Sequence, residues 1–241
     1  MENLQGKTIL ITGAAKRVGK IFALACAKAG ANVMIHHGHS PEEAESLRDE
    51  ISASFSVSAW VLTCDLSLPD SVSQLITQAN EISPLYGLVN SASIFENLSF
   101  QNTSLEDWHK HFAINLTAPF LLSQAFAKQS QHGRIVNILD WRALRPAADH
   151  FPYTVTKSAL ASMTKSLAVA LAPNIIVNGL ALGAILPPAD NSSAKDKIVE
   201  AVPAKRWAEA QEVEQALIFL LTCPTYITGE IIHLDGGRHL V

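Results

Sequence analysis

The stretch KTILITGAAKRVG, residues 7–19, decides the fold of this chain. It opens with an apolar run, passes through a turn of small residues at 12–19, and leads at once into a segment with helical character. An apolar strand that enters a helix through such a turn is typical of the first unit of an open parallel α/β sheet. The turn also lets the backbone approach a pyrophosphate, to which the helix N-terminus offers free N–H groups.

The rest of the chain repeats this alternation of short apolar runs and longer amphipathic stretches. Continuous apolar strands separated by helices indicate a parallel sheet that is covered on both faces. We therefore expect a single doubly wound Rossmann-type α/β domain over residues 1–241, with a seven-stranded parallel sheet flanked by helices. Strands are expected at 7–12, 32–36, 59–63, 85–90, 133–139, 175–180 and 231–234, and helices at 18–29, 41–51, 70–82, 105–129, 153–171 and 212–221. A stretch rich in Gly, Pro, Asn and Ser at 183–193 is expected to be a lid or a mobile connection.

Composition narrows the functional classes. The 241 residues are 48% hydrophobic and 17% charged, with a formal net charge of −4, so a large core is expected and a basic nucleic-acid surface is not. Runs of eighteen apolar residues are absent, and a strand begins almost immediately, so neither a membrane span nor a signal peptide is expected and we predict a cytoplasmic protein. The three cysteines are far apart and are expected to be buried thiols.

The end of the second strand reads IHHGHS, residues 35–40, without an acidic residue. An acid at this position binds the ribose 2′-hydroxyl of a dinucleotide and repels a 2′-phosphate. Its absence, with Arg17 in the preceding turn, favours NADPH over NADH. A metal site built from the three histidines is the alternative, but successive strand residues point to opposite faces. Asp65, after the third strand, either accepts from an adenine amino group or caps the next helix.

Tyr153 and Lys157 lie four residues apart in a segment expected to be helical, so they share a helix face. A nearby positive charge lowers the pKa of a phenol and makes it a usable proton donor. The spacing alone is common, and its position after a dinucleotide-binding half makes it informative.

Over essentially its whole length, the chain resembles the short-chain dehydrogenase/reductase family. Besides the glycine turn and the Tyr153/Lys157 pair, the matching landmarks are Asp65, the NSAS segment 90–93, Asn115, YITG at 226–229 and LDGG at 234–237. Within that family, three features resemble the pteridine reductase branch. Arg17 replaces a glycine of the turn, Asp140 replaces the serine thirteen residues before the tyrosine, and Phe95 matches an aromatic residue that stacks on the pterin.

The resemblance implies a mechanism and a set of site residues. Hydride passes from NADPH to a ring carbon, Tyr153 with Asp140 supplies the proton, Lys157 holds the ribose and lowers the pKa of Tyr153, and Asn115 supports a relay water. Substrate contacts are expected from Arg17, Ser93, Phe95, Asp140 and Tyr153, with a substrate loop at about 183–203. Cofactor contacts are expected from Gly13, Lys16, Arg17, Val18, Gly19, His36, His37, His39, Ser40, Asp65, Leu66, Asn90, Ser91, Ala92, Tyr153, Lys157, Gly183 and Ile185.

The expected reaction is therefore NADPH-dependent reduction of a dihydropterin or dihydrofolate-type C=N bond, without a metal. Reduction of another carbonyl, such as a 3-oxoacyl group on an acyl carrier, and a non-catalytic NADP-binding role are the alternatives. His39, where the branch has an arginine, makes the preference for NADPH less absolute. The family further implies a homotetramer packed through the helices at 105–129 and 153–171.

Overall fold

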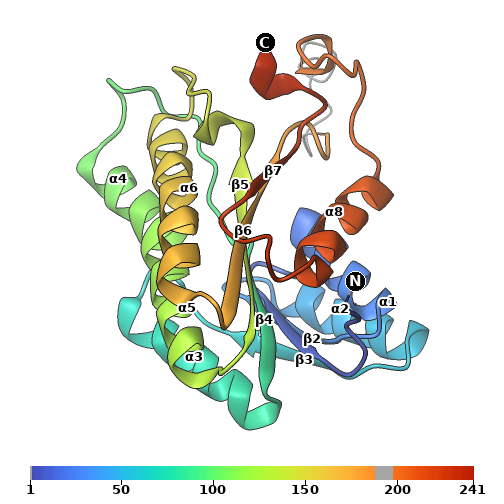
Figure 1. Cartoon of the computed structure of the whole chain (residues 1–241). Helices are drawn as coiled ribbons and strands as arrows, with labels where there is room; N and C mark the ends of the chain where they lie inside the picture. Colours follow the sequence, from blue (N-terminus) through green and yellow to red (C-terminus); the bar gives the residue numbers. More distant parts are fainter. Residues whose placement is uncertain (1, 188–197) are drawn as a thin grey trace.

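A computed structural model describes residues 2–187 and 198–241. Its centre is a seven-stranded parallel sheet with the strand order β3-β2-β1-β4-β5-β6-β7 (Figure 1). This is the doubly wound sheet that the sequence predicts. The strands are β1 (Thr8–Ile11), β2 (Asn32–His37), β3 (Ala59–Thr63), β4 (Leu85–Asn90), β5 (Gly133–Asp140), β6 (Ile175–Leu182) and β7 (Ile231–Leu234).

Helices cover both faces of the sheet, and each face has its own apolar core. One core contains Phe22, Leu47 and Leu217, from the helices on the right of Figure 1, and the other contains Leu75 and Phe126, from helices on the left. The first group is α1 (Arg17–Lys28), α2 (Pro41–Ser54) and α8 (Ala210–Thr222), and the second is α3 (Pro69–Ile82), α4 (Leu105–Phe112), α5 (Ala118–Gln129) and α6 (Phe151–Leu171). Short 3-10 helices occupy Trp141–Ala143 and Arg238–Leu240.

The strand order reverses at β1, which lies between β2 and β4. The connections on the two sides of β1 run in opposite directions, so a crevice forms beyond the carboxyl ends of these strands. The turns after β1, β2, β3, β4 and β5 open toward one region, and each sequence-predicted site residue before residue 141 lies in or near one of them except Asn115.

The helix expected at 105–129 is not continuous. A π-helical turn, Ala113–Thr117, separates α4 from α5, and Asn115 at its centre is fully buried. Apolar periodicity continues through the turn, which is why the sequence pattern predicts one helix. Such turns insert an extra residue and re-aim side chains, often at functional sites.

The extent of the described residues limits what can be said of the substrate loop and of membrane spans. Part of the loop expected at 183–193, and of the wider substrate loop at 183–203, lies outside them, because residues 188–197 are not described. Within the described ranges, every helix is too short or too polar to cross a membrane.

Candidate active site

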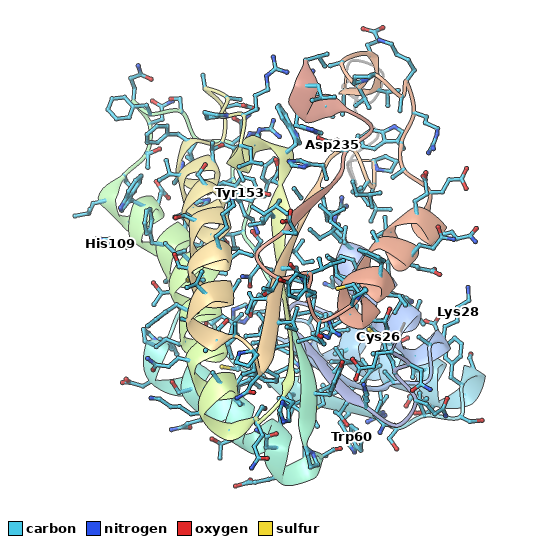
Figure 2. All side chains as sticks on the ribbon, in the orientation of Figure 1. Cys26, Lys28, Trp60, His109, Tyr153 and Asp235 are labelled. Carbon is cyan, nitrogen blue, oxygen red and sulfur yellow. The ribbon has the colours of Figure 1, made fainter. Side chains whose placement is uncertain are left out.

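A cavity of about 1090 Å³ opens at the carboxyl ends of the strands. Tyr153, in the upper part of α6 in Figure 2, is one of the residues that line it. The lining follows six strands in turn, with Gly13 after β1, Gly38 after β2, Cys64 after β3, Ser91 after β4, Asp140 at the end of β5 and Gly183 after β6. One cavity thus joins the predicted cofactor and substrate residues.

The turn after β1 has no room for a side chain at Gly13 or at Gly19. Gly13 has a φ of +64°, and a Cβ there would lie 2.9 Å from the Cα of Ala92. A Cβ on Gly19 would collide with the carbonyl oxygen of Gly13. The N-terminus of α1 begins at this turn, so free N–H groups face a tight backbone cradle. This arrangement fits the pyrophosphate of a dinucleotide.

Arg17 adopts a conformation that normally favours glycine. Its φ is +51°, in the left-handed region, which costs a residue with a side chain on the order of 1–2 kcal/mol. The arginine thus stands at a glycine position of the turn without changing its backbone shape, and it adds a guanidinium to the cavity lining. Beside it, Lys16 forms an exposed ion pair with Glu43 of α2 at 2.6 Å.

The histidines after β2 divide into two kinds. His36 accepts from the Gly13 N–H through Nδ1 at 3.2 Å and bonds to the Cys64 carbonyl through Nε2 at 2.9 Å. Burial lowers the pKa of His36 to about 4, so the ring is neutral and supports the glycine turn. His37 bonds to Ser40 and Thr63 and is not part of the cavity lining, whereas His39 and Ser40 are.

Asp65 lines the cavity, but its Oδ1 is already engaged. It accepts from both the backbone N–H and the hydroxyl of Ser67, at 2.9 and 2.7 Å, and these hydrogen bonds lower its pKa. The carboxylate therefore organises the turn before α3 and keeps Leu66 at the cavity wall. The sequence predicts either local capping or contact with a ligand for Asp65. Oδ1 serves the local turn, and Oδ2, which accepts no hydrogen bond from a described residue, is available to a ligand.

Hydrogen bonds with polar side chains fix the turn after β4 and the strand end beneath it. Thr12 accepts from the N–H groups of Ser91 and Ala92 at 2.9 and 3.0 Å. Asn90 lies beneath this turn, where it donates to Asn137 inside the sheet, and does not reach the cavity. Polar residues thus fix a backbone that passes close to Gly13.

Asn115 positions the segment that carries Phe95. Its side chain accepts from the N–H of Ile94 at 2.9 Å and from Ser93 Oγ at 3.1 Å, and donates to the Ile94 carbonyl at 3.1 Å. The π-helical turn aims the amide at this segment. Asn115 itself is not part of the cavity lining.

Tyr153 and Asp140 form the chemical centre of the cavity. Tyr153 Oη donates to Asp140 Oδ2 at 3.2 Å. Burial raises the pKa of Asp140, and burial together with the Asp140 carboxyl raises the pKa of Tyr153 well above its ordinary value. Both groups therefore hold a proton to higher pH than they would in water, an arrangement that can deliver a proton.

Lys157 does not lower the pKa of Tyr153 as the sequence suggests. Its Nζ donates to the Ile138 carbonyl at 2.8 Å and lies 5.6 Å from the centre of the Tyr153 ring. Burial lowers the pKa of Lys157 to about 8. Lys157 lies behind the cavity lining, and the pKa of Tyr153 is raised first by burial and then by the Asp140 carboxyl.

Phe95 is an aromatic wall of the cavity, but one of its faces is covered. The His150 ring stacks on it at a centroid distance of 3.8 Å, and the Tyr153 ring lies nearly perpendicular to it, with the ring centroids 4.7 Å apart. His150 has a φ of +53° immediately before α6, which brings its ring over Phe95. A substrate ring must use the other face or displace the imidazole.

Several residues of the cavity were not predicted from the sequence. For all of them but Trp207, closeness in sequence to Asp140, Tyr153 or the LDGG turn was the available signal, but the apolar pattern does not show which of them face the cavity. They are Trp141, Arg142, Asp149, His150, Trp207 and Arg238. Of the predicted residues, His37, Asn90, Asn115 and Lys157 lie behind the lining, whereas Val18, Ser93, Gly183 and Ile185 lie in it. Within the described ranges, no cluster of three or more His, Cys, Asp or Glu could hold a metal.

Comparison with known proteins gives a consistent picture. The family model described as enoyl-(acyl carrier protein) reductase matches residues 13–239. The 3-oxoacyl-[acyl-carrier-protein] reductase FabG of Aquifex aeolicus is 34% identical over 97% of this chain and 98% of its own. FolM alternative dihydrofolate reductase 1 from Brucella canis, solved with NADP, superposes with a TM-score of 0.92 at 34% identity, over 99% of this chain and 96% of its own. A Serratia marcescens short-chain dehydrogenase/reductase gives a TM-score of 0.93 at 26% identity, over 99% and 100%.

Proposed function

Because the chain belongs to the short-chain dehydrogenase/reductase family, we propose that it is an NADPH-dependent reductase of dihydropterin or dihydrofolate-type C=N bonds. The Asp140–Tyr153 hydrogen bond carries this proposal. Reduction of a C=N bond places a proton on a basic ring nitrogen, and a carboxylic acid with a raised pKa is a proton source that a serine hydroxyl is not.

The proton passes through two groups of this chain. Tyr153 Oη, at the cavity wall, donates its proton to the substrate nitrogen, and Asp140 returns a proton to the phenol oxygen across their hydrogen bond. Asp140 then takes a proton from solvent, to which 15% of its side chain is exposed. Phe95 supplies an apolar face on which a planar, electron-poor ring can stack.

The cofactor contacts follow from the cradle at the N-terminus of α1. Gly13, Val18 and Gly19 would hold the pyrophosphate, and Lys16, Arg17, His39 and Ser40 the 2′-phosphate end. The bound reduced nicotinamide supplies the hydride. The FolM structure from Brucella suis, solved in complex with NADP at 34% identity and a TM-score of 0.92, agrees with this choice of cofactor.

Lys157 and Asn115 act from behind the lining. The buried ammonium of Lys157 fixes the end of β5 through the Ile138 carbonyl, two residues before Asp140. Asn115 fixes Ser93 and Ile94, and thereby Phe95. The proposed roles in holding a ribose and a relay water require contacts with bound molecules and stay predictions.

A second candidate is reduction of a 3-oxoacyl thioester. The family description and the Aquifex aeolicus relative favour it. Asp140 argues against it, because polarising a ketone oxygen requires hydroxyl donors and no stored proton on a carboxyl group.

The test compares substrates on the intact protein. NADPH oxidation is followed with 7,8-dihydrobiopterin, 7,8-dihydrofolate and an acetoacetyl thioester at matched concentrations. The proposal expects turnover with at least one dihydropterin and a lower kcat/KM with the thioester. Turnover with the thioester alone would contradict the proposal and favour the second candidate.

The family also suggests a homotetramer, and two side chains mark the helix faces that would form it. Phe120 on α5 and Val169 on α6 are 43% and 83% exposed. Sedimentation equilibrium measures the assembly directly, and a monomer at micromolar concentration would contradict this part of the proposal.

A further inference from the structure

Two carboxyl groups at the substrate end of the cavity share one guanidinium. Arg142 Nη2 donates to Asp149 Oδ2 at 2.9 Å, whereas its Nη1 lies 3.8 Å from Asp140 Oδ1, beyond hydrogen-bond distance but close enough for its charge to lower the pKa of Asp140. The Arg142 side chain is only 16% exposed, and its Nε is buried without a hydrogen-bond partner among the described residues. The guanidinium is thus bound at one end and turned toward Asp149.

The backbone of Arg142 is fixed, so the guanidinium is the part that can change partner. The backbone N–H of Arg142 donates to Asp140 Oδ1 at 2.9 Å. The guanidinium carbon, Cζ, lies 4.7 Å from the centre of the Trp141 ring. Without Asp149, Asp140 would be the nearest carboxyl group to the guanidinium. A small rotation about the side chain would then close the 3.8 Å gap.

The other charged or titratable groups that act on Asp140 are Tyr153 and Lys157 from α6 and His150 from the turn before it. Lys157 Nζ donates to the Ile138 carbonyl, and Tyr153 Oη donates to Asp140 Oδ2. The imidazole of His150 bonds to Asp149 at 3.0 Å. Of the two cations that lower the pKa of Asp140, Arg142 has the larger effect, and its guanidinium has a second carboxyl partner in Asp149.

A guanidinium bound directly to a carboxylate stabilises the ionised form and lowers the carboxyl pKa by about 1–3 units. Direct binding by Arg142 would offset the burial that raises the pKa of Asp140, and the proton needed for reduction would be lost. Burial alone would raise the pKa of Asp149, but the hydrogen bonds and charges of Arg142 and His150 together lower it, so Asp149 is the competing anion.

Building on the proposed function, we propose that Asp149 is a positioning residue that holds the Arg142 guanidinium away from Asp140, so that Asp140 keeps the proton it passes to Tyr153. Asp149 contacts neither the phenol nor the acid. It acts by removing a cation from the vicinity of the acid.

The test measures the pH profile of kcat with a dihydropterin in three variants. Asp149→Asn is expected to move the alkaline limb to lower pH by about one unit, since Arg142 then binds Asp140. Arg142→Met is expected to move it to higher pH by a similar amount, roughly one unit. The double variant is expected to follow Arg142→Met, because Asp149 acts only through the guanidinium.

Three results would overturn the proposal. These are an unchanged limb in Asp149→Asn, a shift in the same direction in both single variants, and a shift by Asp149→Asn that persists when Arg142 is methionine. The last result would assign the effect to the Asp149–His150 hydrogen bond instead. Asp149→Glu should restore most of the wild-type profile. Arg145→Gln is the matched control, since Arg145 lies outside the cavity lining and bonds to the Arg238 carbonyl.

A second measurement separates this proposal from the function itself. The carboxyl carbons of aspartate-labelled protein are titrated by NMR in the presence of NADP, with the Asp140 signal assigned by its loss in Asp140→Asn. The Asp140 midpoint should fall in Asp149→Asn and rise in Arg142→Met, and unmoved midpoints would overturn the proposal. Absence of dihydropterin turnover in the wild type would instead contradict the proposed function, and the NMR titration would still decide the role of Asp149.

Discussion

The phenol oxygen of Tyr153 donates to the Oδ2 of Asp140 at 3.2 Å, across the carboxyl end of β5. Burial raises the pKa of both groups, and the Asp140 carboxyl raises that of Tyr153 further, so both groups hold a proton to higher pH than they would in water. A hydroxyl in contact with a protonated carboxyl group can give up its proton and regain it without a charge remaining in the dry part of the cavity.

Replacing Tyr153 with phenylalanine should remove the last donor to the substrate. We expect kcat to fall by about 10²–10⁴-fold, the usual contribution of a general acid, while NADPH affinity changes by less than about threefold. Steady-state kinetics and quenching of tryptophan fluorescence by NADPH measure the two quantities. A kcat near that of the wild type would remove Tyr153 from the chemistry.

The pH profile of kcat should reflect Asp140. The acid acts in its protonated form, so turnover should be highest below its pKa and should fall as the pH rises through it. Because burial raises that pKa, the decline should begin above the ordinary range of an aspartic acid, which lies near 3.9. Asp140→Asn, which cannot titrate, should lose this limb together with most of the turnover. A limb that survives in the variant belongs to another group.

Arg17→Gly should separate stability from binding. The glycine relieves the positive φ but makes the unfolded chain more flexible, so these opposing effects should change the free energy of unfolding by less than about 1 kcal/mol. Loss of the guanidinium from the cavity should raise the KM for NADPH and substrate by about tenfold. Lys205→Gly is the matched control, with a φ of +55° outside the cavity lining, and its kinetics should match those of the wild type. An equal loss of binding in both variants would contradict a role for the Arg17 side chain.

Gly13→Ala should damage the fold and the cofactor site together. The new Cβ would meet the Ala92 Cα at 2.9 Å on a backbone with a φ of +64°. We expect the free energy of unfolding to fall by more than about 1 kcal/mol and NADPH binding to weaken at least tenfold. Thermal unfolding with and without NADPH checks both, and Gly38→Ala, where a Cβ meets only the Cys64 carbonyl oxygen at 3.7 Å, is a milder comparison. Normal NADPH binding by Gly13→Ala would show that the cradle is not needed.

Much of the fold follows from the sequence, because buried parallel strands are continuous apolar runs. All seven expected strands form, and β6 extends two residues further, to Leu182, where it pairs with Asp140. The π-helical turn at Asn115 could not be predicted in this way. At this turn the buried Asn115 amide bonds to the Ile94 backbone and the Ser93 hydroxyl, a contact between distant parts of the chain.

The candidate site also has a part that the sequence predicts and a part that it does not. Residues within contiguous motifs, such as Gly13, Gly19 and Tyr153, lie where the sequence suggests. The relations among Arg142, Asp149 and His150 depend on how the loop before α6 packs on Phe95, which periodicity does not describe. His36 differs from its expected role. The sequence predicts that it contacts the cofactor, but both of its ring nitrogens form hydrogen bonds within the protein.

The most direct measurement of the central claim is the ratio of kcat/KM for 7,8-dihydrobiopterin to that for an acetoacetyl thioester, in the wild type and in Asp140→Ser. If Asp140 stores the proton for C=N reduction, the ratio should fall at least about tenfold in the variant, mainly through kcat for the pterin. NADPH affinity should stay within about threefold of the wild type, since Asp140 lies at the substrate end. An unchanged ratio, or a ratio that already favours the thioester in the wild type, would contradict the account.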